Sequence, residues 1–306
     1  MNNLKIVSVI INCFNSEKFI EECLKSVLNQ TYRNLELIIV DNNSTDNTKK
    51  TIEKFNDDRI KYFYLNEHLK LGEARNYALK KCSGEFIAFI DSDDIWVKYK
   101  LEEQIKIFSK PDVGLVFCNS YKFKEDGWKQ KIYKKAPPTG YIFRNLFVNY
   151  FISLETVIIR REVIFKLKRY FYEEFQIIEE FDLICRLSLI TKFEYVDKVM
   201  AYWRFREDSF TWKNRHLIHK ERETMLRLFY QEINSFENSY NNEIILFNKR
   251  TLLEEILYLI QCNQIKLAKI KLKTYLFKDL KWTLLYFILS SYFLTKIVMR
   301  RLGYLY

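Results

Sequence analysis

The stretch EFIAFIDSDD, residues 85–94, indicates the fold class of this chain. Its first six residues are mostly apolar and predict a short buried strand, whereas its last four include three carboxylates. Carboxylates clustered at the end of a buried strand repel one another, which is costly unless a cation offsets their charge. Asp91 and Asp93 are one residue apart, so both can point the same way from an extended backbone. The stretch therefore predicts a strand end that meets positive charge.

The residues before this stretch alternate between strand and helix patterns. Apolar, β-branched runs predict strands, and apolar residues at helical spacing predict helices. Such alternation is typical of an α/β fold with a doubly wound, mostly parallel sheet flanked by helices. The predicted strands cover residues 5–12, 35–40, 59–64 and 85–90, and the predicted helices begin near Asn15, run for about ten residues after Ser44-Thr45-Asp46, and cover 72–81.

Three polar segments follow the predicted strands, at Asn12–Glu17, Asp41–Asn43 and Asp91–Asp94. Ligands of doubly wound sheets bind at the carboxyl ends of the strands, so we expect these segments to share one crevice. Asp41 could cap the following helix or accept an N–H from a nucleobase, and the pattern alone favours neither. The carboxylates of Asp91–Asp94 could begin a helix, but their position at a strand end favours a hard cation such as Mg²⁺ or Mn²⁺.

The second half of the chain has a looser pattern. Strands are expected at 113–123 and 154–160, separated by a charged stretch at 124–138, and a helix is expected at 179–190. From about residue 216 the pattern predicts helices to the end. We therefore divide the chain into residues 1–110, residues 111–215 and a helical extension at 216–306.

A specific resemblance supports this division. SVIINCFNSEKFIEECLKSVLNQTYRNLELIIVDNNSTDNT, residues 8–48, followed by LGEARNYALKKCSGEFIAFIDSDD, residues 71–94, resembles the family 2 glycosyltransferases of the GT-A fold. Weaker similarity continues to about residue 211. The resemblance implies that residues 1–110 bind the nucleotide-sugar donor and residues 111–215 bind the acceptor. The resemblance implies an inverting hexosyl- or N-acetylhexosaminyltransferase that takes one sugar from a UDP-sugar with the help of Mn²⁺ or Mg²⁺. The acceptor would be a hydroxyl of a glycan or of a lipid-linked saccharide, in the synthesis of a cell-surface polysaccharide or glycoconjugate.

The resemblance also implies roles for residues near the donor. Asp41 matches the residue that contacts uracil, and Arg75 in LGEARN matches an arginine near the diphosphate. Asp91 and Asp93 match the DxD motif, with Asp93 the direct metal ligand and Asp91 facing ribose or a metal-bound water. Asp94 is expected to begin the next helix. The family often has DDGS where this chain has DNNS at 41–44, which bears on nucleotide selectivity. Further residues expected to contact the nucleotide sugar are Asn12, Phe14, Asn15, Glu17, Asn43, Ser92 and Glu179.

A base is needed on the far side of the sugar, because the acceptor hydroxyl loses a proton as it attacks. The segment IEEFDL, residues 178–183, resembles the family's base segment and places Glu180 in that role. The alternative is a solvated acidic helix start, which the helix dipole favours. YWRFREDSFT, residues 202–211, resembles a segment that closes over the diphosphate, so Arg204 and Arg206 are candidate phosphate contacts. Arg206 stands where a His is frequent and cannot bind metal. The alternative is an aromatic and basic surface strand.

The net charge of +11 is concentrated at the C-terminus. Residues 1–110 are neutral, whereas residues 264–306 carry nine basic side chains and one acid. The uncharged run at 282–295 is short for a membrane span, but its basic flanks and aromatic residues suit a helix lying at a membrane surface. A buried core helix or a homodimer helix would fit the same run. We favour the membrane and expect a cytoplasmic protein at the inner face of the cell membrane.

Three other classes of protein can be compared with the features of this sequence. A processive polysaccharide synthase usually carries a QxxRW motif and several spanning helices, and neither occurs in this sequence. Nucleic-acid binding would need basic residues on the folded platform, whose first 110 residues are neutral, so no nucleic-acid partner is expected. A catalytically inactive, membrane-docked module on the same fold stays open. The six cysteines form no CxxC pair and are expected to be reduced, in keeping with an N-terminal run that predicts a strand rather than a signal peptide.

Overall fold

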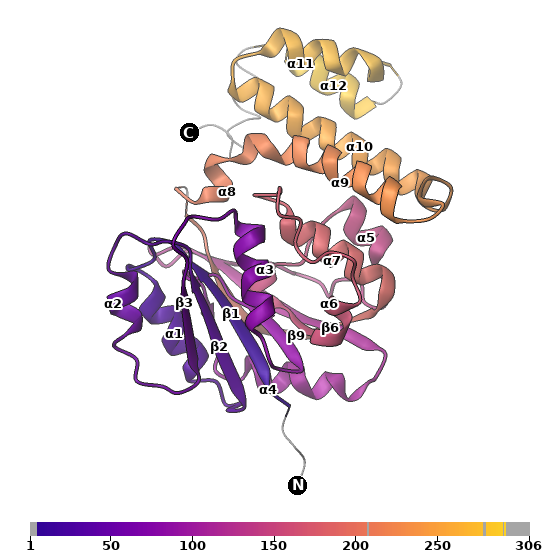
Figure 1. The fold of residues 1–306 in the computed structure, drawn as a ribbon. Helices are drawn as coiled ribbons and strands as arrows, with labels where there is room; N and C mark the ends of the chain where they lie inside the picture. Colours follow the sequence, from indigo (N-terminus) through magenta and orange to yellow (C-terminus); the bar gives the residue numbers. More distant parts are fainter. Residues whose placement is uncertain (1–4, 207, 278–279, 290, 292–306) are drawn as a thin grey trace. The chain divides into compact units, whose positions relative to one another are not determined.

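The computed structural model describes residues 5–206, 208–277, 280–289 and 291 (Figure 1). The chain divides into two compact units, residues 1–212 and 213–306. A further boundary near residue 110 stays a prediction, because a single sheet runs through the first unit on both sides of that position.

The first unit is built on a mixed sheet whose strand order is β3-β2-β1-β4-β8-β6-β9-β5, with β7 paired to β6. Neighbouring strands β3, β2, β1 and β4 are parallel, and so are β6 and β9, whereas β8 is antiparallel to both β4 and β6. The strands are β1 (Val7–Cys13), β2 (Leu35–Asp41), β3 (Ile60–Tyr64), β4 (Phe86–Phe89), β5 (Ile95–Trp96), β6 (Val113–Phe123), β7 (Lys129–Lys131), β8 (Ile158–Arg160) and β9 (Lys192–Arg204).

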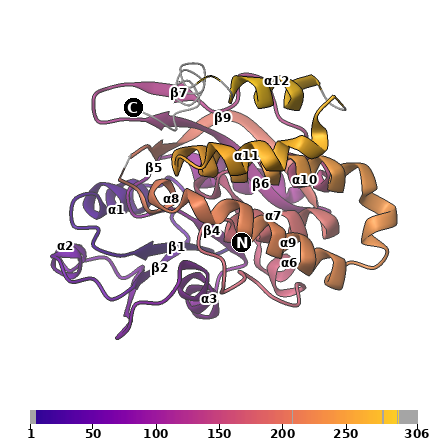
Figure 2. The same ribbon diagram turned by 90° about the horizontal axis from the view of Figure 1, so that it is seen from above.

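Helices cover both faces of this sheet. Figures 1 and 2 show α1 on one face of β1 and β2 and α3 on the other. The strand order reverses between β1 and β4, so the crevice at their carboxyl ends is the position where doubly wound sheets bind ligands. The helices are α1 (Ile20–Leu28), α2 (Thr48–Ile52), α3 (Leu71–Lys81), α4 (Lys100–Ile105), α5 (Phe143–Val148), α6 (Arg161–Phe165), α7 (Glu179–Ile190) and α8 (Phe210–Lys213).

The core explains why these segments fold as they do. Every residue of β2 is buried, as expected for a central parallel strand with helices on both faces. Helix α1 turns a stripe that includes Ile20, Cys23, Leu24 and Val27 into the same core, which also holds Phe86. The α/β fold with a doubly wound, mostly parallel sheet and C-terminal helices is therefore confirmed.

Local differences from the predicted elements have identifiable causes. The helix after Ser44 is only five residues long: it begins at Thr48 and ends at Ile52, where the backbone N–H of Phe55 turns back to the Ile52 carbonyl at 3.0 Å. The strand expected at 154–160 begins as a 3-10 turn at Leu154–Thr156 and is extended only at β8. The prediction that Asp94 begins a helix is wrong. The chain continues into β5, and the Asp94 carboxylate accepts the backbone N–H of Arg204 at 2.8 Å.

The second unit is helical where the structure describes it. It contains α9 (Ile218–Glu232), α10 (Phe236–Gln261), α11 (Ile265–Leu272) and α12 (Leu280–Ile288), and α10 is kinked at Tyr240. Its core includes Ile256 and Leu259 of α10 with Leu272 of α11. Of the helices that the structure describes, none combines the length and the apolar character that crossing a bilayer would take. The run at 282–295 is described only through 289 and at 291, so its remainder lies outside the described residues.

Candidate active site

The carboxyl ends of β1, β2 and β4 lie side by side and bring together the three polar segments singled out from the sequence. In the parallel registers Cys13 is opposite Asp41, and Ile10 is opposite Phe89. The hydroxyls of Ser16 and Ser92 are 2.8 Å apart, which joins the loop after β1 to the DSDD motif after β4. The expected convergence of these segments is therefore present in the fold.

Asp41 is fully buried and both of its carboxylate oxygens have partners. Oδ1 accepts the backbone N–H of Ser44 at 2.9 Å, and Oδ2 accepts the hydroxyl of Tyr62 at 2.7 Å. These bonds hold the loop after β2. They do not cap α2, which begins at Thr48 after Asn47, so the interpretation of Asp41 as a helix cap is wrong. Contact between Asp41 and a uracil ring stays a prediction.

The loops after β1 and β2 hold each other. Asn43 has φ +67° and Asn15 has φ +48°, a left-handed conformation that Asn adopts more readily than most residues other than Gly. The family's Gly in DDGS is thus replaced here by a residue that tolerates the same kind of turn. The Asn15 side chain accepts the backbone N–H of Thr45 at 2.9 Å, and Glu17 accepts the backbone N–H of Asn47 at 2.9 Å.

Asn12, in β1, and Phe14, directly after it, have groups that a ligand could contact. The Nδ2 atom of Asn12 is buried and finds no hydrogen-bond acceptor in the part of the chain that the structure describes. A buried amide without a partner costs free energy, which a ligand's hydrogen-bond acceptor would recover. Phe14 is exposed, with its ring 4.3 Å from that of His68, and offers an aromatic face.

The DSDD motif contains carboxylates in three different environments. Asp91 has a half-exposed side chain, Asp93 is largely buried, and Asp94 is fully buried. Burial, and then the neighbouring charge of Asp91, raises the pKa of Asp93, and Arg206 only partly opposes this. Burial, and then the charge of Glu155, raises the pKa of Asp94 well above its usual range. Negative charge at this motif is therefore only partly compensated by the protein.

Arg75 connects the motif to the helix that carries the predicted base. It projects from α3, is nearly completely buried, and pairs through Nη2 with Asp91 Oδ1 at 3.2 Å and through Nη1 with Glu179. Glu179 is the first residue of α7. A guanidinium can bind two carboxylates at once, so one arginine fixes both sides of the crevice.

Glu180 follows Glu179 in the first turn of α7 and is partly exposed. Loss of hydration raises the pKa of Glu180 to about 8, the charge of Arg75 opposes this, and the charges of Glu179 and Asp91 add to it. A carboxyl whose pKa lies near neutrality can accept and release a proton under working conditions, which suits a general base.

Arg204 and Arg206 both contact the DSDD motif from β9 and the residues after it. Arg204 is buried, donates from Nε to the Asp93 carbonyl at 2.7 Å, and pairs with Glu22 and Glu125. Arg206 is about one-third exposed and lies with Nε 3.1 Å from Asp93 Oδ2. Arg206 is thus the more accessible of the two, and a phosphate contact by either stays a prediction.

The residues present fit a hard divalent cation. Asp91 and Asp93 offer carboxylate oxygens at a position where the protein leaves negative charge uncompensated. Among the described residues no three His, Cys, Asp or Glu side chains gather as a complete metal set. Mg²⁺ is commonly held by one or two carboxylates together with substrate phosphates, so the pair is sufficient for that type of site.

The sequence did not predict the contacts of three residues in the site. Tyr62 lies in the middle of β3, and Ser16 was read only as part of a helix start, so neither pattern indicated a contact to Asp41 or Ser92. Asn76 directly follows Arg75 in LGEARN and makes three hydrogen bonds to residues nearly one hundred positions away. Its position next to a singled-out arginine was the one available indication.

Comparisons with known proteins bear on the family and the fold. The family model of Glycosyl transferase family 2 matches residues 8–168. The chain is 39% identical over 160 residues to the Escherichia coli UDP-Glc:alpha-D-GlcNAc-diphosphoundecaprenol beta-1,3-glucosyltransferase WfgD, covering 52% of this chain and 62% of that protein. It is 36% identical over 165 residues to the putative teichuronic acid biosynthesis glycosyltransferase TuaG of Bacillus subtilis, covering 53% and 65%. The chain thus matches less than two thirds of the length of these relatives.

Solved structures show the same fold. S. aureus TarS in complex with UDP-GlcNAc superimposes with a TM-score of 0.58 at 22% identity, covering 87% of this chain and 90% of that one. The mannosyltransferase PcManGT from Pyrobaculum calidifontis, in complex with GDP-Man and Mn²⁺, gives a TM-score of 0.62 at 17% identity, covering 93% and 79%. At these identities the similarity establishes the GT-A fold and nothing finer.

Proposed function

We propose, from the premise that this chain belongs to glycosyl transferase family 2, that it moves one sugar from a UDP-sugar to an acceptor hydroxyl with inversion at the sugar carbon. The observation that carries the proposal is the ion-pair bridge from Asp91 through Arg75 to Glu179, next to Glu180. This bridge ties an acidic motif suited to a diphosphate and its cation to a carboxylate suited to accept a proton. A single-displacement transfer needs both.

The donor side would be formed by the crevice at β1, β2 and β4. Asn12 and Phe14 would meet the nucleoside, with Asp41 contacting uracil from the loop that it also stabilises. Asp93 and Asp91 would hold Mg²⁺ or Mn²⁺, which neutralises charge on the departing diphosphate when it is bound. Arg75, and Arg206 beside Asp93, would add positive charge close to the same phosphates.

The base side would be Glu180. As the acceptor oxygen forms its bond to the sugar carbon, the bond from that carbon to the diphosphate oxygen breaks, and UDP leaves with that electron pair. The acceptor's proton passes to the Glu180 carboxylate, whose pKa of about 8 makes it a stronger base than an ordinary glutamate. Arg75 orients α7 by pairing with Glu179, so that the carboxylate faces the sugar.

For the acceptor we propose a saccharide carried on a membrane lipid. The name of WfgD states a GlcNAc-diphosphoundecaprenol acceptor, and that of TuaG states teichuronic acid biosynthesis. The second unit offers a surface that suits a membrane at the cytoplasmic side. It exposes Ile270, Leu280, Leu284 and Phe287 on α11 and α12, together with basic residues such as Lys273 and Lys281.

The proposal is tested with purified protein and a panel of UDP-, GDP- and dTDP-sugars, with and without Mn²⁺. We expect the melting temperature to rise with UDP-sugars and to rise further with Mn²⁺, because ligand binding stabilises the folded state. Release of UDP should then increase when a lipid-linked GlcNAc acceptor is added. Nucleotide binding without any transfer, unchanged in an Asp93→Ala variant, would instead favour an inactive binding module.

The membrane surface has a separate test. Replacing Leu284 and Phe287 with Glu should reduce sedimentation with vesicles that contain anionic phospholipid, while leaving UDP affinity unchanged. Replacing two exposed apolar residues of the first unit, Phe165 and Tyr141, with Glu provides the matched control. Equal vesicle binding by both double variants would contradict the membrane role of α12 and leave a homodimer as the alternative to examine by light scattering.

A further inference from the structure

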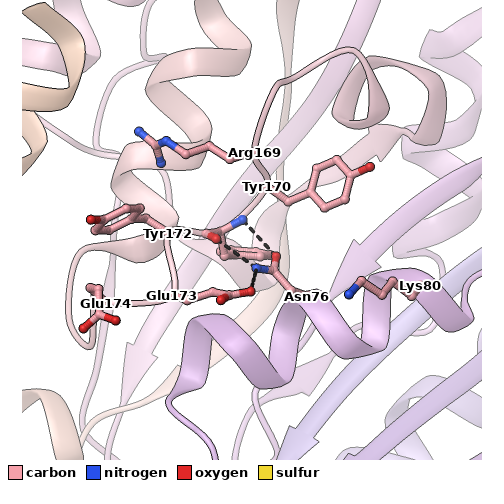
Figure 3. A pocket seen from close by; sticks show the side chains of 8 residues that line it. Asn76, Lys80, Arg169, Tyr170, Tyr172, Glu173 and Glu174 are labelled. Carbon is pink, nitrogen blue, oxygen red and sulfur yellow. Dashed lines mark hydrogen bonds between the residues drawn. The ribbon is translucent and has the colours of Figure 1, made fainter. Parts of the chain in front are cut away.

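The segment of residues 169–174 contacts both helices that carry the Arg75–Glu179 ion pair. It lies against α3, which carries Arg75, and it leads to α7, which carries Glu179. Its outer side borders an open cavity of about 530 Å³, lined in part by Tyr170, Tyr172 and Lys80 (Figure 3). The segment is held from two sides: Arg186 of α7 donates to the carbonyls of Arg169 and Tyr170, and α3 contacts Phe171.

Asn76 makes the central contact between α3 and this segment. Its Nδ2 donates to the Phe171 carbonyl at 2.9 Å, and its Oδ1 accepts the Phe171 backbone N–H at 3.0 Å, as the dashed lines in Figure 3 show. A further bond joins Nδ2 to Glu173 at 3.1 Å. The two bonds to Phe171 are buried and therefore shielded from competition with water, whereas Glu173 is exposed at the cavity. One side chain thus satisfies both backbone groups of Phe171.

The residue held in this way lies under Arg75. The Phe171 ring is buried, and its centroid is 5.4 Å from the Arg75 guanidinium, within the range of a cation–π contact. The same ring packs edge-on against Phe89, the last residue of β4, at 5.6 Å. The Phe171 ring therefore packs against the Arg75 guanidinium, which pairs with Asp91 and Glu179.

We propose that Asn76 is a positioning residue for the donor: by fixing Phe171, it holds the Arg75 guanidinium where a nucleoside diphosphate must meet it. This inference rests on the proposed function and adds to it a residue outside the donor contacts. Asn76 acts only through Phe171 and Arg75. A purely structural role would instead cost stability without a specific effect on the diphosphate.

The chain contains a matched control for this test. Asn119 in β6 is fully buried and makes the same two bonds to the backbone of Tyr133, at 2.9 and 3.0 Å, with a third to the Tyr195 hydroxyl at 3.0 Å. It has the same hydrogen-bond pattern as Asn76, but its partners are Tyr133 and Tyr195 instead of Phe171. We expect Asn76→Ala and Asn119→Ala to lower the melting temperature by similar amounts.

The decisive measurement is the dissociation constant for UDP with Mn²⁺, by calorimetry on the full chain. We expect Asn76→Ala to raise it about tenfold, within the range for residues that share one network, and Asn119→Ala to leave it within about twofold. In an Arg75→Ala background, Asn76→Ala should have no further effect. If Asn76→Ala proves too unstable to study, Phe171→Leu removes the ring while keeping the backbone bonds, and it should weaken UDP binding to the same extent.

If the wild-type protein binds UDP, two results would overturn this inference without affecting the proposed function. One is unchanged UDP affinity in both Asn76→Ala and Phe171→Leu. The other is an equal loss of affinity from Asn76→Ala with and without Arg75. A wild-type chain that binds no UDP would overturn the proposed function and this inference together, so the two failures can be told apart.

Discussion

Glu36 and Glu180 lie near opposite ends of the central strands and have opposite surroundings. Glu36, near the start of β2, is buried, and its carboxylate accepts bonds from Ser8, Lys61 at 2.6 Å and the backbone N–H of Ser83 at 2.6 Å. Burial alone would raise the pKa of Glu36, but the bonds from Lys61, Ser8 and Ser83 lower it to about 2. Burial raises the pKa of Glu180, and the opposing charge of Arg75 leaves it at about 8.

The difference separates a structural carboxylate from a reactive one. The Glu36 carboxylate has its donors built into the protein, including Gly84, where an added Cβ would lie 2.7 Å from the Ile6 carbonyl. Glu36 therefore stays ionised, and its bonds connect the beginning of β2 to β1, to β3 and to the residues before β4. At the other end, the pKa values of Asp93 and Glu180 are raised, because the protein does not fully compensate the negative charge of their ionised forms. Uncompensated carboxylates cost stability, and they can bind a cation or a proton when the substrates arrive.

The largest expected effect is on catalysis by Glu180. Glu180→Gln keeps the shape of the side chain but cannot accept the acceptor's proton, so transfer should fall about 10²–10⁴-fold. UDP affinity should change little. The control is Glu162→Gln, an exposed glutamate in the first turn of α6. Transfer by Glu180→Gln within twofold of wild type, measured as UDP release with acceptor, would contradict its role as the base.

The second effect concerns the motif at the end of β4. Asp93→Asn removes a charged oxygen ligand, and we expect Mn²⁺-dependent transfer to fall about 10²–10³-fold. Mn²⁺ binding in the presence of UDP, followed by electron paramagnetic resonance, should weaken in parallel. Asp112→Asn, which alters an exposed carboxylate paired with Lys192, is the control. Unaltered Mn²⁺ binding in Asp93→Asn would show that Asp93 is not a metal ligand.

The third effect is a pH dependence. General-base catalysis needs the ionised carboxylate, and the pKa of Glu180 is about 8. The transfer rate should therefore rise about tenfold per pH unit below that value and level off above it. Because Arg75 opposes the rise in this pKa, Arg75→Gln should move the midpoint to higher pH. A rate that is flat from pH 6 to 9 would exclude Glu180 as the titrating base.

Sequence reasoning predicted the candidate site because the signals of that site are local. The end of a strand is recognised as an apolar run followed by polar residues. DSDD, LGEARN and IEEFDL are each contiguous motifs of four to six residues. Sequence reasoning did not find Tyr62 against Asp41, Ser16 against Ser92, or the bonds from Asn76 to Phe171. Those contacts join residues that are 21, 76 and 95 positions apart, and no periodicity in a single sequence encodes such a pairing.

The Asp94 prediction failed for a related reason. An aspartate after a strand commonly begins a helix, and the local pattern favoured that outcome. In the fold, β9 lies between β6 and β5 and places the Arg204 backbone N–H next to Asp94, so a contact 110 positions away determines the role of Asp94. Local charge patterns thus predict where ionised groups gather, and the tertiary structure decides which of them are paired.

The fourth effect tests the structural end of the comparison. Glu36→Gln replaces a paired carboxylate, and hydrogen bonds to charged groups contribute more than neutral ones, so unfolding free energy should fall by about 2 kcal/mol. Because the folded-state pKa of Glu36 is lowered to about 2, its contribution is present above about pH 4.5 and is lost as pH falls toward 2. The difference between wild type and Glu36→Gln in urea unfolding should therefore shrink on acidification. A constant difference would contradict the ion pairing.

The smallest effect is a gain of stability at the reactive end. The folded-state pKa of Glu180 is raised, so wild-type stability attributable to this group is highest below about pH 4.5 and falls as pH rises toward 8. Glu180→Gln removes that loss because it never ionises. Its melting temperature should exceed that of wild type by about 2–4 °C at pH 8, with a smaller difference at pH 5. A variant that is less stable than wild type at pH 8 would show that the ionised Glu180 is favourably paired in the fold, and the contrast with Glu36 would then fail.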